Sequence, residues 1–336
     1  MTLRVACVGA GYFAQFHYDS WARMDRVTQV GACDTDIAKA EATGRPAFAD
    51  LATMLDQQKP DLLDIILPPV GHAAAITTAL DAGIKWIICQ KPFCQNMTEA
   101  AAINARADAA GATIIVHENF RFQPWFRAIK SAIDAGHIGD LRQATFRLRP
   151  GDGQGPDAYL ERQPYFRDMD RLLIHETGVH YFDVFRYLIG EPTAIYADLR
   201  RENPVIKGED AGHVIIDFAN GARALLDGNR TLDHAADNLR CTMGEGLIEG
   251  TQGTLALTGD GAVTLRAFHA TTAQQILAPS TWDGFGGDCV HALQSHVVAG
   301  ILDGTPLENR SADYMRILQI ENAAYDAAKD GRKRQL

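Results

Sequence analysis

The chain has 336 residues, a length that fits two domains of ordinary size and can bury a full hydrophobic core without disulfides or structural metals. Its composition, 46% hydrophobic and 22% charged, is typical of a folded globular protein and excludes the disordered and fibrous classes. The net charge of −10 repels the phosphates of nucleic acids, so we expect no nucleic-acid partner.

The sequence also argues against a membrane protein. The longest uncharged run, residues 65–80, is interrupted by Pro68, Pro69 and Gly71 and is too short for a membrane span. The N-terminus carries one arginine and passes directly into a glycine motif, unlike a secretory leader. The six cysteines have no metal-ligand spacing, which predicts buried thiols and no bound metal. We therefore expect a cytoplasmic protein with no membrane partner.

The first 120 residues or so alternate short apolar runs with amphipathic stretches, which predicts a parallel sheet with helices on both faces. The predicted strands are 3–8, 27–33, 62–67, 86–89 and 114–116. Helices are predicted at 73–82 and 97–110, because Gly83 and Gly111 follow them as stop signals.

The pattern changes after a predicted helix at 124–135. Residues 150–170 are rich in glycine, proline and aromatic residues, which predicts a long ordered loop of the kind that often carries function. Asn220-Gly221 and residues 259–261 predict antiparallel hairpins. The predicted strands are 194–199, 213–218, 223–226, 247–249, 254–258 and 263–268, and the predicted helices lie near 176–189, 288–303 and 311–329.

These elements predict an α/β protein with two domains. Residues 1–122 are expected to form a Rossmann domain, which is a doubly wound parallel sheet. Residues 123–336 are expected to form an α+β domain with a mostly antiparallel open sheet, for substrate binding and oligomerisation.

A G-x-G-x-x-A motif follows the first predicted strand. It comprises Gly9, Gly11, Tyr12, Phe13 and Ala14. Such a motif makes a tight turn, lets the backbone approach a pyrophosphate and allows close packing of helix on strand. Asp34 ends the second strand, 25 residues after Gly9, where a carboxylate accepts hydrogen bonds from a ribose and repels a 2′-phosphate. No arginine follows within 35–38, so the pattern predicts NAD rather than NADP.

Lys91 comes directly after a buried strand and Gln90, and Pro92 restricts the chain beyond it. A single lysine is usually a solvated surface charge. Here its position at the carboxyl end of a parallel strand, where open α/β sheets bind ligands, favours a site residue.

The segment 171–183 opens the next predicted helix. A spacing of four places Glu176 and His180 on one helix face, where the carboxylate can orient the imidazole. Alternatively, Glu176 complements the helix N-terminus and His180 is a buried core histidine. The local pattern leaves both interpretations open.

Taken together, these motifs resemble the Gfo/Idh/MocA family of pyridine-nucleotide oxidoreductases over nearly the whole chain. Besides the glycine motif, the matching elements are Pro68-Pro69-x-x-His72, Gln90-Lys91-Pro92, Asn119-x-Arg121-Phe122 and Glu176-x-Gly178-x-His180-x-x-Asp183. The chain departs from the family pattern at Gln90, where the family has glutamate, and at Glu176, where it has aspartate. Both residues keep a hydrogen-bonding group, although Gln90 lacks a charge.

The resemblance implies an active site between the nucleotide domain and the antiparallel sheet, with a carbohydrate or polyol substrate. It implies that Lys91 and His180 are catalytic, and that Pro68, His72, Gln90 and Lys91 join the glycine motif and Asp34 in binding the cofactor. Hydride transfer needs a base that works near neutral pH, which histidine provides. Lys91 would stabilise negative charge on the reacting oxygen, and Glu176 would orient His180.

Substrate contacts are expected at Asn119, Arg121, Tyr165 and His175, although His175 is equally well explained as a structural residue. The loop and its approaches also carry arginines that could bind an anionic substrate. Pairing with nearby acids is the favoured explanation for them. These arginines are Arg147, Arg149, Arg162, Arg167 and Arg171.

Two other functions remain open, of which the first uses the same site residues. One is an NAD-dependent lyase or glycosidase that oxidises its substrate only transiently, and the other is a nucleotide-binding protein without catalysis. Strands 213–218 and 222–226 have apolar side chains on both faces, which predicts a homodimer or homotetramer.

Overall fold

The computed structural model describes residues 2–336, which form two compact units. The first unit contains the chain up to Asn119 together with residues 290–318, and the second contains 120–289 and 319–336. The first unit thus includes a segment from near the C-terminus, which the change of sequence pattern near residue 122 does not indicate. The backbone N–H of Val116 donates to the carbonyl of Asn309 at 2.8 Å, so this late segment lies along the edge of the first sheet.

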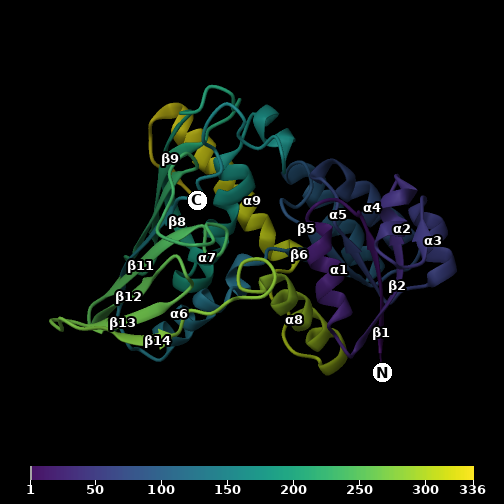
Figure 1. Cartoon of the computed structure of the whole chain (residues 1–336), viewed down its shortest axis with the longest axis horizontal. Coiled ribbons are helices and arrows are strands. Elements are labelled where there is room, and N and C mark those ends of the chain that lie inside the picture. Colours follow the sequence, from purple (N-terminus) through teal and green to yellow (C-terminus); the bar gives the residue numbers. More distant parts are fainter. Residues whose placement is uncertain (1) are drawn as a thin grey trace. The chain divides into compact units, whose positions relative to one another are not determined.

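Within residues 2–336, the first unit holds a six-stranded parallel sheet in the order β3-β2-β1-β4-β5-β6 (Figure 1). The predicted Rossmann architecture is therefore confirmed. The strands are β1 (Leu3–Val8), β2 (Val27–Cys33), β3 (Ala47–Phe48), β4 (Leu62–Ile65), β5 (Trp86–Gln90) and β6 (Thr113–His117). The sequence pattern does not predict β3, because two residues are too few to show a period.

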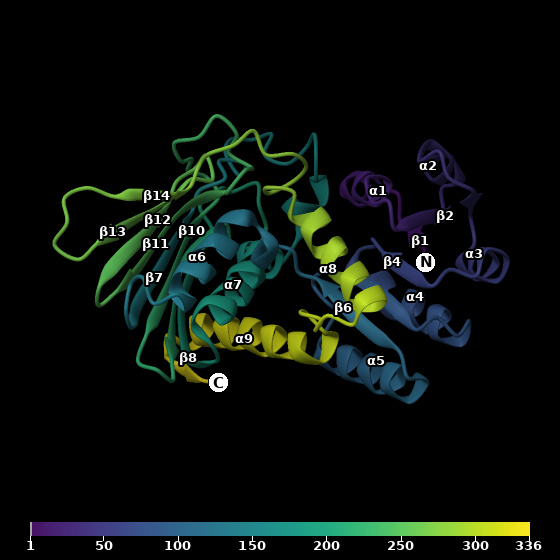
Figure 2. The same cartoon turned by 90° about the horizontal axis from the view of Figure 1, so that it is seen from below.

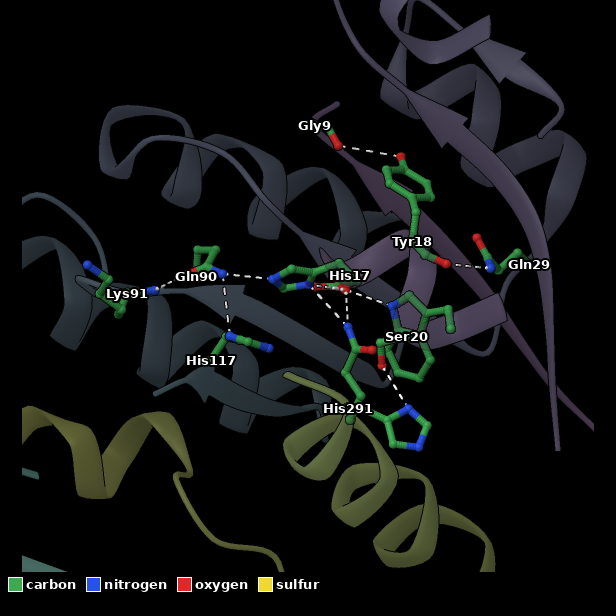
Figure 3. Close-up of polar contacts among 12 residues, drawn as sticks. Gly9, His17, Tyr18, Ser20, Gln29, Gln90, Lys91, His117 and His291 are labelled. Carbon is green, nitrogen blue, oxygen red and sulfur yellow. Dashed lines mark hydrogen bonds and ion pairs between the residues drawn. The ribbon is translucent and has the colours of Figure 1, made fainter. Parts of the chain in front are cut away.

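Helices cover both faces of this sheet. α4 packs against α3 and α5 on one face, whereas α1 and α8 are joined by a hydrogen bond between Ser20 and His291 (Figures 2 and 3). Gly111 ends α5 in the left-handed conformation with a φ of 61°, as the stop signal indicates. The helices are α1 (Ala14–Ala22), α2 (Ile37–Ala42), α3 (Leu51–Gln58), α4 (Pro69–Asp81), α5 (Met97–Ala110) and α8 (Cys289–Asp303).

The second unit holds a nine-stranded sheet within the described residues, in the order β14-β13-β12-β11-β7-β10-β9-β8-β15. β7 and β10 run parallel and the other neighbours antiparallel, which confirms the mostly antiparallel sheet, including both predicted hairpins. The strands are β7 (Leu141–Leu148), β8 (Pro192–Arg200), β9 (Ala211–Phe218), β10 (Arg223–Asn229), β11 (Gly244–Gly250), β12 (Gly253–Leu257), β13 (Val263–Ala267), β14 (Gln274–Leu277) and β15 (Arg334–Gln335).

Helices α6 (Pro124–Asp134) and α7 (Val179–Ile189) lie along one face of the second sheet (Figure 2). α9 (Ser311–Asp330) begins in the first unit and ends in the second. A π-helical turn over Leu173–Gly178 precedes α7, in place of the α-helical start that the sequence predicts. Such turns are frequent at functional sites.

The loop 150–170 is ordered around a small apolar core of its own. Tyr159 and Phe166 are its largest members, and they pack with Leu172 and Ile206. All six cysteines are buried thiols within residues 2–336. In the same part of the chain, no helix has both the length and the apolar character that crossing a bilayer requires.

Candidate active site

The turn after β1 requires glycine at position 9. Gly9 has a φ of 102°, and a Cβ at this position would lie 2.2 Å from the carbonyl oxygen of Ile66. Its N–H donates to the carbonyl of Cys33 at 2.8 Å, and its carbonyl accepts from the Tyr18 hydroxyl at 3.4 Å (Figure 3). Burial raises the pKa of Tyr18, so its hydroxyl stays protonated as a donor.

Asp34 stabilises the same turn from the end of β2. Its Oδ2 accepts the N–H of Ala10 at 2.8 Å, and its Oδ1 accepts the N–H of Asp36 at 3.0 Å. The side chain remains half-exposed, and each carboxylate oxygen has a further lone pair for a ribose hydroxyl. The carboxylate is thus held rigidly beside the glycine turn.

Gly11 is not required by packing within the chain. It is exposed, and an added Cβ would meet no atom within 4 Å. The open space above this backbone therefore fits the approach of a pyrophosphate.

We expect Gly11→Ala to leave the fold intact and weaken NAD binding. An added methyl group that crowds a ligand costs about 1–3 kcal/mol. This corresponds to a roughly 5- to 150-fold loss of affinity. Titration by fluorescence and a thermal melt check both expectations. Gly9→Ala is the matched control, because it should destabilise the fold itself; native NAD affinity in Gly11→Ala would contradict the assignment.

His72, expected among the cofactor contacts, has no exposed surface. Its Nε2 lies 2.8 Å from the carbonyl oxygen of Leu67, and burial lowers its pKa, so the neutral ring donates to this carbonyl. The His72 ring thus holds the backbone at Leu67, directly before Pro68. In the motif Pro68-Pro69-x-x-His72, Pro68 is exposed and His72 is buried.

Gln90, the last residue of β5, points into the protein interior and not toward solvent. It is 7% exposed, its Nε2 lies 2.8 Å from Nε2 of His17, and its Oε1 accepts the backbone N–H of Lys91 at 3.1 Å (Figure 3). His17 in turn contacts Asp64 at 2.8 Å. The sequence reasoning does not select His17 or Asp64, although a lone charge inside the apolar run 62–67 is a usable signal.

His180 in the second unit is 6% exposed and lies flat on Phe120, with ring centroids 3.8 Å apart and ring planes 4° apart. Arg121 makes a bidentate ion pair with Asp183, in which Nε donates to Oδ2 at 2.7 Å and Nη2 to Oδ1 at 2.5 Å. Phe120 and Arg121 thus hold α7 through His180 and Asp183, which lie three residues apart on one face of the helix. The structure places Arg121, expected as a substrate contact, in this ion pair.

The π-helical turn carries His175 and Glu176. His175 Nδ1 lies 2.7 Å from Oε1 of Glu321, and the backbone N–H of His175 donates to the Tyr325 hydroxyl at 3.2 Å. These contacts favour the structural interpretation of His175. Glu176 is partly exposed on the same turn.

Arg230, at the end of β10, is a central residue that the sequence reasoning does not select. It is 2% exposed and donates to Asp152 at 2.8 Å, to the Tyr159 hydroxyl at 2.7 Å and to Thr177 Oγ1 at 2.6 Å. Burial disfavours its charge, but Asp152 and Tyr159 hold the pKa of Arg230 above its usual range. The loop 150–170 is thereby fastened to the turn that carries Glu176.

Acidic partners also account for three of the loop arginines. Arg147 pairs with Glu245 at 3.1 Å, Arg149 with Asp227 at 2.6 Å and Arg162 with Asp152 at 3.2 Å. The expected pairing with the acids of the loop itself is confirmed for Arg162, whereas Arg147 and Arg149 pair instead with acids of β11 and β10. Tyr165 is 57% exposed and packs edge-on against Phe166.

The candidate residues are divided between the two units. Lys91 and the cofactor residues belong to the first, together with Asn119, which is buried two residues after β6. His180, Glu176 and Tyr165 belong to the second.

A parallel sheet with a glycine turn after β1 is the arrangement of a dinucleotide-binding protein, and in this chain a mostly antiparallel sheet follows it. Residues 3–118 match an oxidoreductase family described by its NAD-binding Rossmann fold, and residues 126–256 match the Gfo/Idh/MocA C-terminal domain. The chain belongs to the Gfo/Idh/MocA family. It is an enzyme, and its cofactor is NAD.

Three known proteins are similar to the chain over almost its full length. D-apiose dehydrogenase of Paraburkholderia graminis is 29% identical, over 97% of this chain and 88% of that protein. Inositol 2-dehydrogenase of Rhizobium meliloti is 25% identical, over 99% of each. The crystal structure of an oxidoreductase from Agrobacterium radiobacter, in complex with NAD+, L-tartaric acid and magnesium, has a TM-score of 0.90 at 26% identity, over 100% of this chain and 98% of that one.

Proposed function

We propose that this protein is an NAD-dependent dehydrogenase that oxidises a hydroxyl carbon of a sugar, sugar acid or polyol, with Lys91 and His180 as catalytic residues. The observation that carries the proposal is the common position of the glycine turn, Asp34 and Lys91. All three follow the carboxyl ends of parallel strands, the edge at which such sheets bind ligands. The names of the two dehydrogenase relatives support the sugar and polyol class.

Bound NAD supplies the hydride acceptor, and this chain's own residues manage the proton and the charge. Lys91 donates a hydrogen bond to the reacting hydroxyl and stabilises negative charge that develops on its oxygen. His180 removes the hydroxyl proton as general base. Stacking on Phe120 holds the His180 ring in one plane, and Glu176 orients it. The exposed backbone at Gly11 admits the pyrophosphate.

A panel of sugars, sugar acids and polyols that includes apiose and inositol, followed by NADH absorbance, tests the proposal. Net NADH formation on at least one free compound is expected. Glycoside cleavage without net NADH would support the lyase or glycosidase instead. NAD binding without turnover on any compound would support a binding protein.

NAD should bind more tightly than NADP. A 2′-phosphate would meet the Asp34 carboxylate, and like charges about 4 Å apart repel by roughly 1–4 kcal/mol. We therefore expect roughly tenfold weaker binding of NADP, or more, in fluorescence titrations. Asp34→Asn keeps an oxygen that accepts the Ala10 N–H but removes the negative charge. It should therefore reduce the difference between the affinities for NAD and NADP. Equal or tighter binding of NADP would sink the prediction.

We also propose that the chain assembles into a homodimer or homotetramer through the face of the second sheet that α6 and α7 leave open. The register places an apolar row across six neighbouring strands on this face. The row consists of Ala256, Leu247, Thr145, Leu225, Ile215 and Tyr196. A parallel row of polar and charged contacts flanks it, including the ion pair of Arg147 with Glu245 and the contact of His213 with Asp227. A second copy would cover the apolar row and leave the charges at the rim.

A charge in the middle of this row should separate the copies. Leu225→Glu is expected to give the 36.7 kDa mass of one chain in light scattering at micromolar concentration, whereas the native protein gives a multiple of it. Leu232→Glu, at an exposed residue beyond β10, is the control and should leave the assembly intact. A native mass of one chain would refute the proposal.

A further inference from the structure

The end of β5 is joined to a buried polar cluster that the proposed reaction does not use. His17 of α1, Asp64 of β4 and Gln294 of α8 have no exposed surface, and Gln90 has very little. His17 contacts Gln90 on one side (Figure 3) and the Asp64 carboxylate on the other, and Trp21 donates to the same carboxylate. A fully buried carboxylate is costly to keep unless its hydrogen bonds are well made, so the cluster calls for an explanation.

Which atoms of this cluster donate and which accept can be assigned by starting at Lys91. The backbone N–H of Lys91 can only donate, and it meets Oε1 of Gln90 at 3.1 Å. The amide nitrogen of Gln90 must then face His17, 2.8 Å from its Nε2, so that Nε2 accepts. The proton of the neutral His17 ring therefore lies on Nδ1, which donates to Asp64 Oδ2 at 2.8 Å.

The contacts at the Asp64 end are compatible with this assignment. Trp21 Nε1 can only donate, and it meets the same oxygen of Asp64 at 2.8 Å. Gln294 Nε2 lies 3.2 Å from that oxygen and also 3.2 Å from Nδ1 of His17. Every donor from Lys91 onward thus points toward one carboxylate, and hydrogen bonds aligned in this way strengthen one another in a low-dielectric interior.

We propose that His17 and Asp64 are positioning residues for Lys91, acting through Gln90, with His17 present as the neutral Nδ1–H imidazole. The inference rests on the proposed role of Lys91. Asp64 holds His17, His17 holds the Gln90 amide in one orientation, and the amide oxygen holds the backbone from which the Lys91 side chain extends. A misplacement of about 1 Å in a catalytic group costs on the order of 10²-fold in rate.

Three variants separate positioning from stability. His17→Phe keeps a ring that can pack beside Phe13 but removes both nitrogens, so kcat should fall by about 10²-fold while the KM for NAD changes little. His17→Gln restores an acceptor and a donor at similar spacing and should recover most of kcat. Ser20→Ala is the matched control, since it removes the contact of α1 with His291 and leaves the contacts of His17 with Gln90 and Asp64 in place. It should lower the thermal midpoint with kcat near native.

An NMR measurement, which does not depend on turnover, tests which nitrogen of His17 carries the proton. In ¹⁵N NMR near neutral pH, the native His17 ring should show a protonated Nδ1 and an unprotonated Nε2. In Gln90→Glu a carboxylate oxygen faces Nε2, so His17 should take up a second proton there. Protonated Nε2 in the native protein would overturn the inference. So would equal losses of kcat in His17→Phe and Ser20→Ala, or no recovery in a folded His17→Gln. Native turnover in Lys91→Ala would overturn the proposed function, while the NMR result would still decide the state of His17.

Discussion

Lys91→Ala and His180→Ala are each expected to lower kcat by about 10²–10⁴-fold, the contribution typical of a general acid–base group, with NAD affinity close to native. The glycine turn, Asp34 and their hydrogen bonds remain intact in both variants, so the cofactor should still bind, although Lys91 is one of its expected contacts. Steady-state kinetics on the compound found in the panel, together with NAD titration, provide the measurement.

Two further variants sharpen this result. Glu176→Gln should cost less than either alanine variant, because an amide can still orient the His180 ring. Near-normal turnover in His180→Ala would mean that His180 is a buried core histidine stacked on Phe120 and that another group is the base.

Asp152→Ala is expected to destabilise the protein by about 3–5 kcal/mol, because it leaves the buried Arg230 guanidinium without its counter-ion. The Asp152 side chain is 15% exposed and that of Arg230 is 2% exposed, so water is a poor replacement for the lost partner. Chemical unfolding measures the change. The loop 150–170 should loosen as well, because Asp152 also accepts from Tyr159 and Arg162.

A double variant and a surface control decide whether the buried charge is responsible. Arg230→Met/Asp152→Ala removes both charges and should be less destabilised than Asp152→Ala alone. Asp303→Ala breaks an exposed bidentate pair with Arg26 and should scarcely change the unfolding midpoint. Similar losses in Asp152→Ala and Asp303→Ala would contradict the role assigned to Arg230.

The sequence by itself determines the Rossmann half, because its signals are local. A buried parallel strand reads as an apolar run, and Gly111 marks the end of α5 within one residue. The glycine turn is equally local, because a φ of 102° at position 9 favours glycine. Asp34 is recognisable in the sequence because it directly follows the apolar run that forms β2.

Only the tertiary structure decides which polar groups meet. Gln90 and His17 are 73 residues apart and Arg230 and Asp152 are 78 apart, so no periodicity relates them. Arg121 carries the hydrogen-bond donors expected of a substrate contact, but these donors meet Asp183, which lies 62 residues away in the sequence on α7. The physical reason is that a buried polar group must find a partner, and packing, not local pattern, determines which partner is within reach.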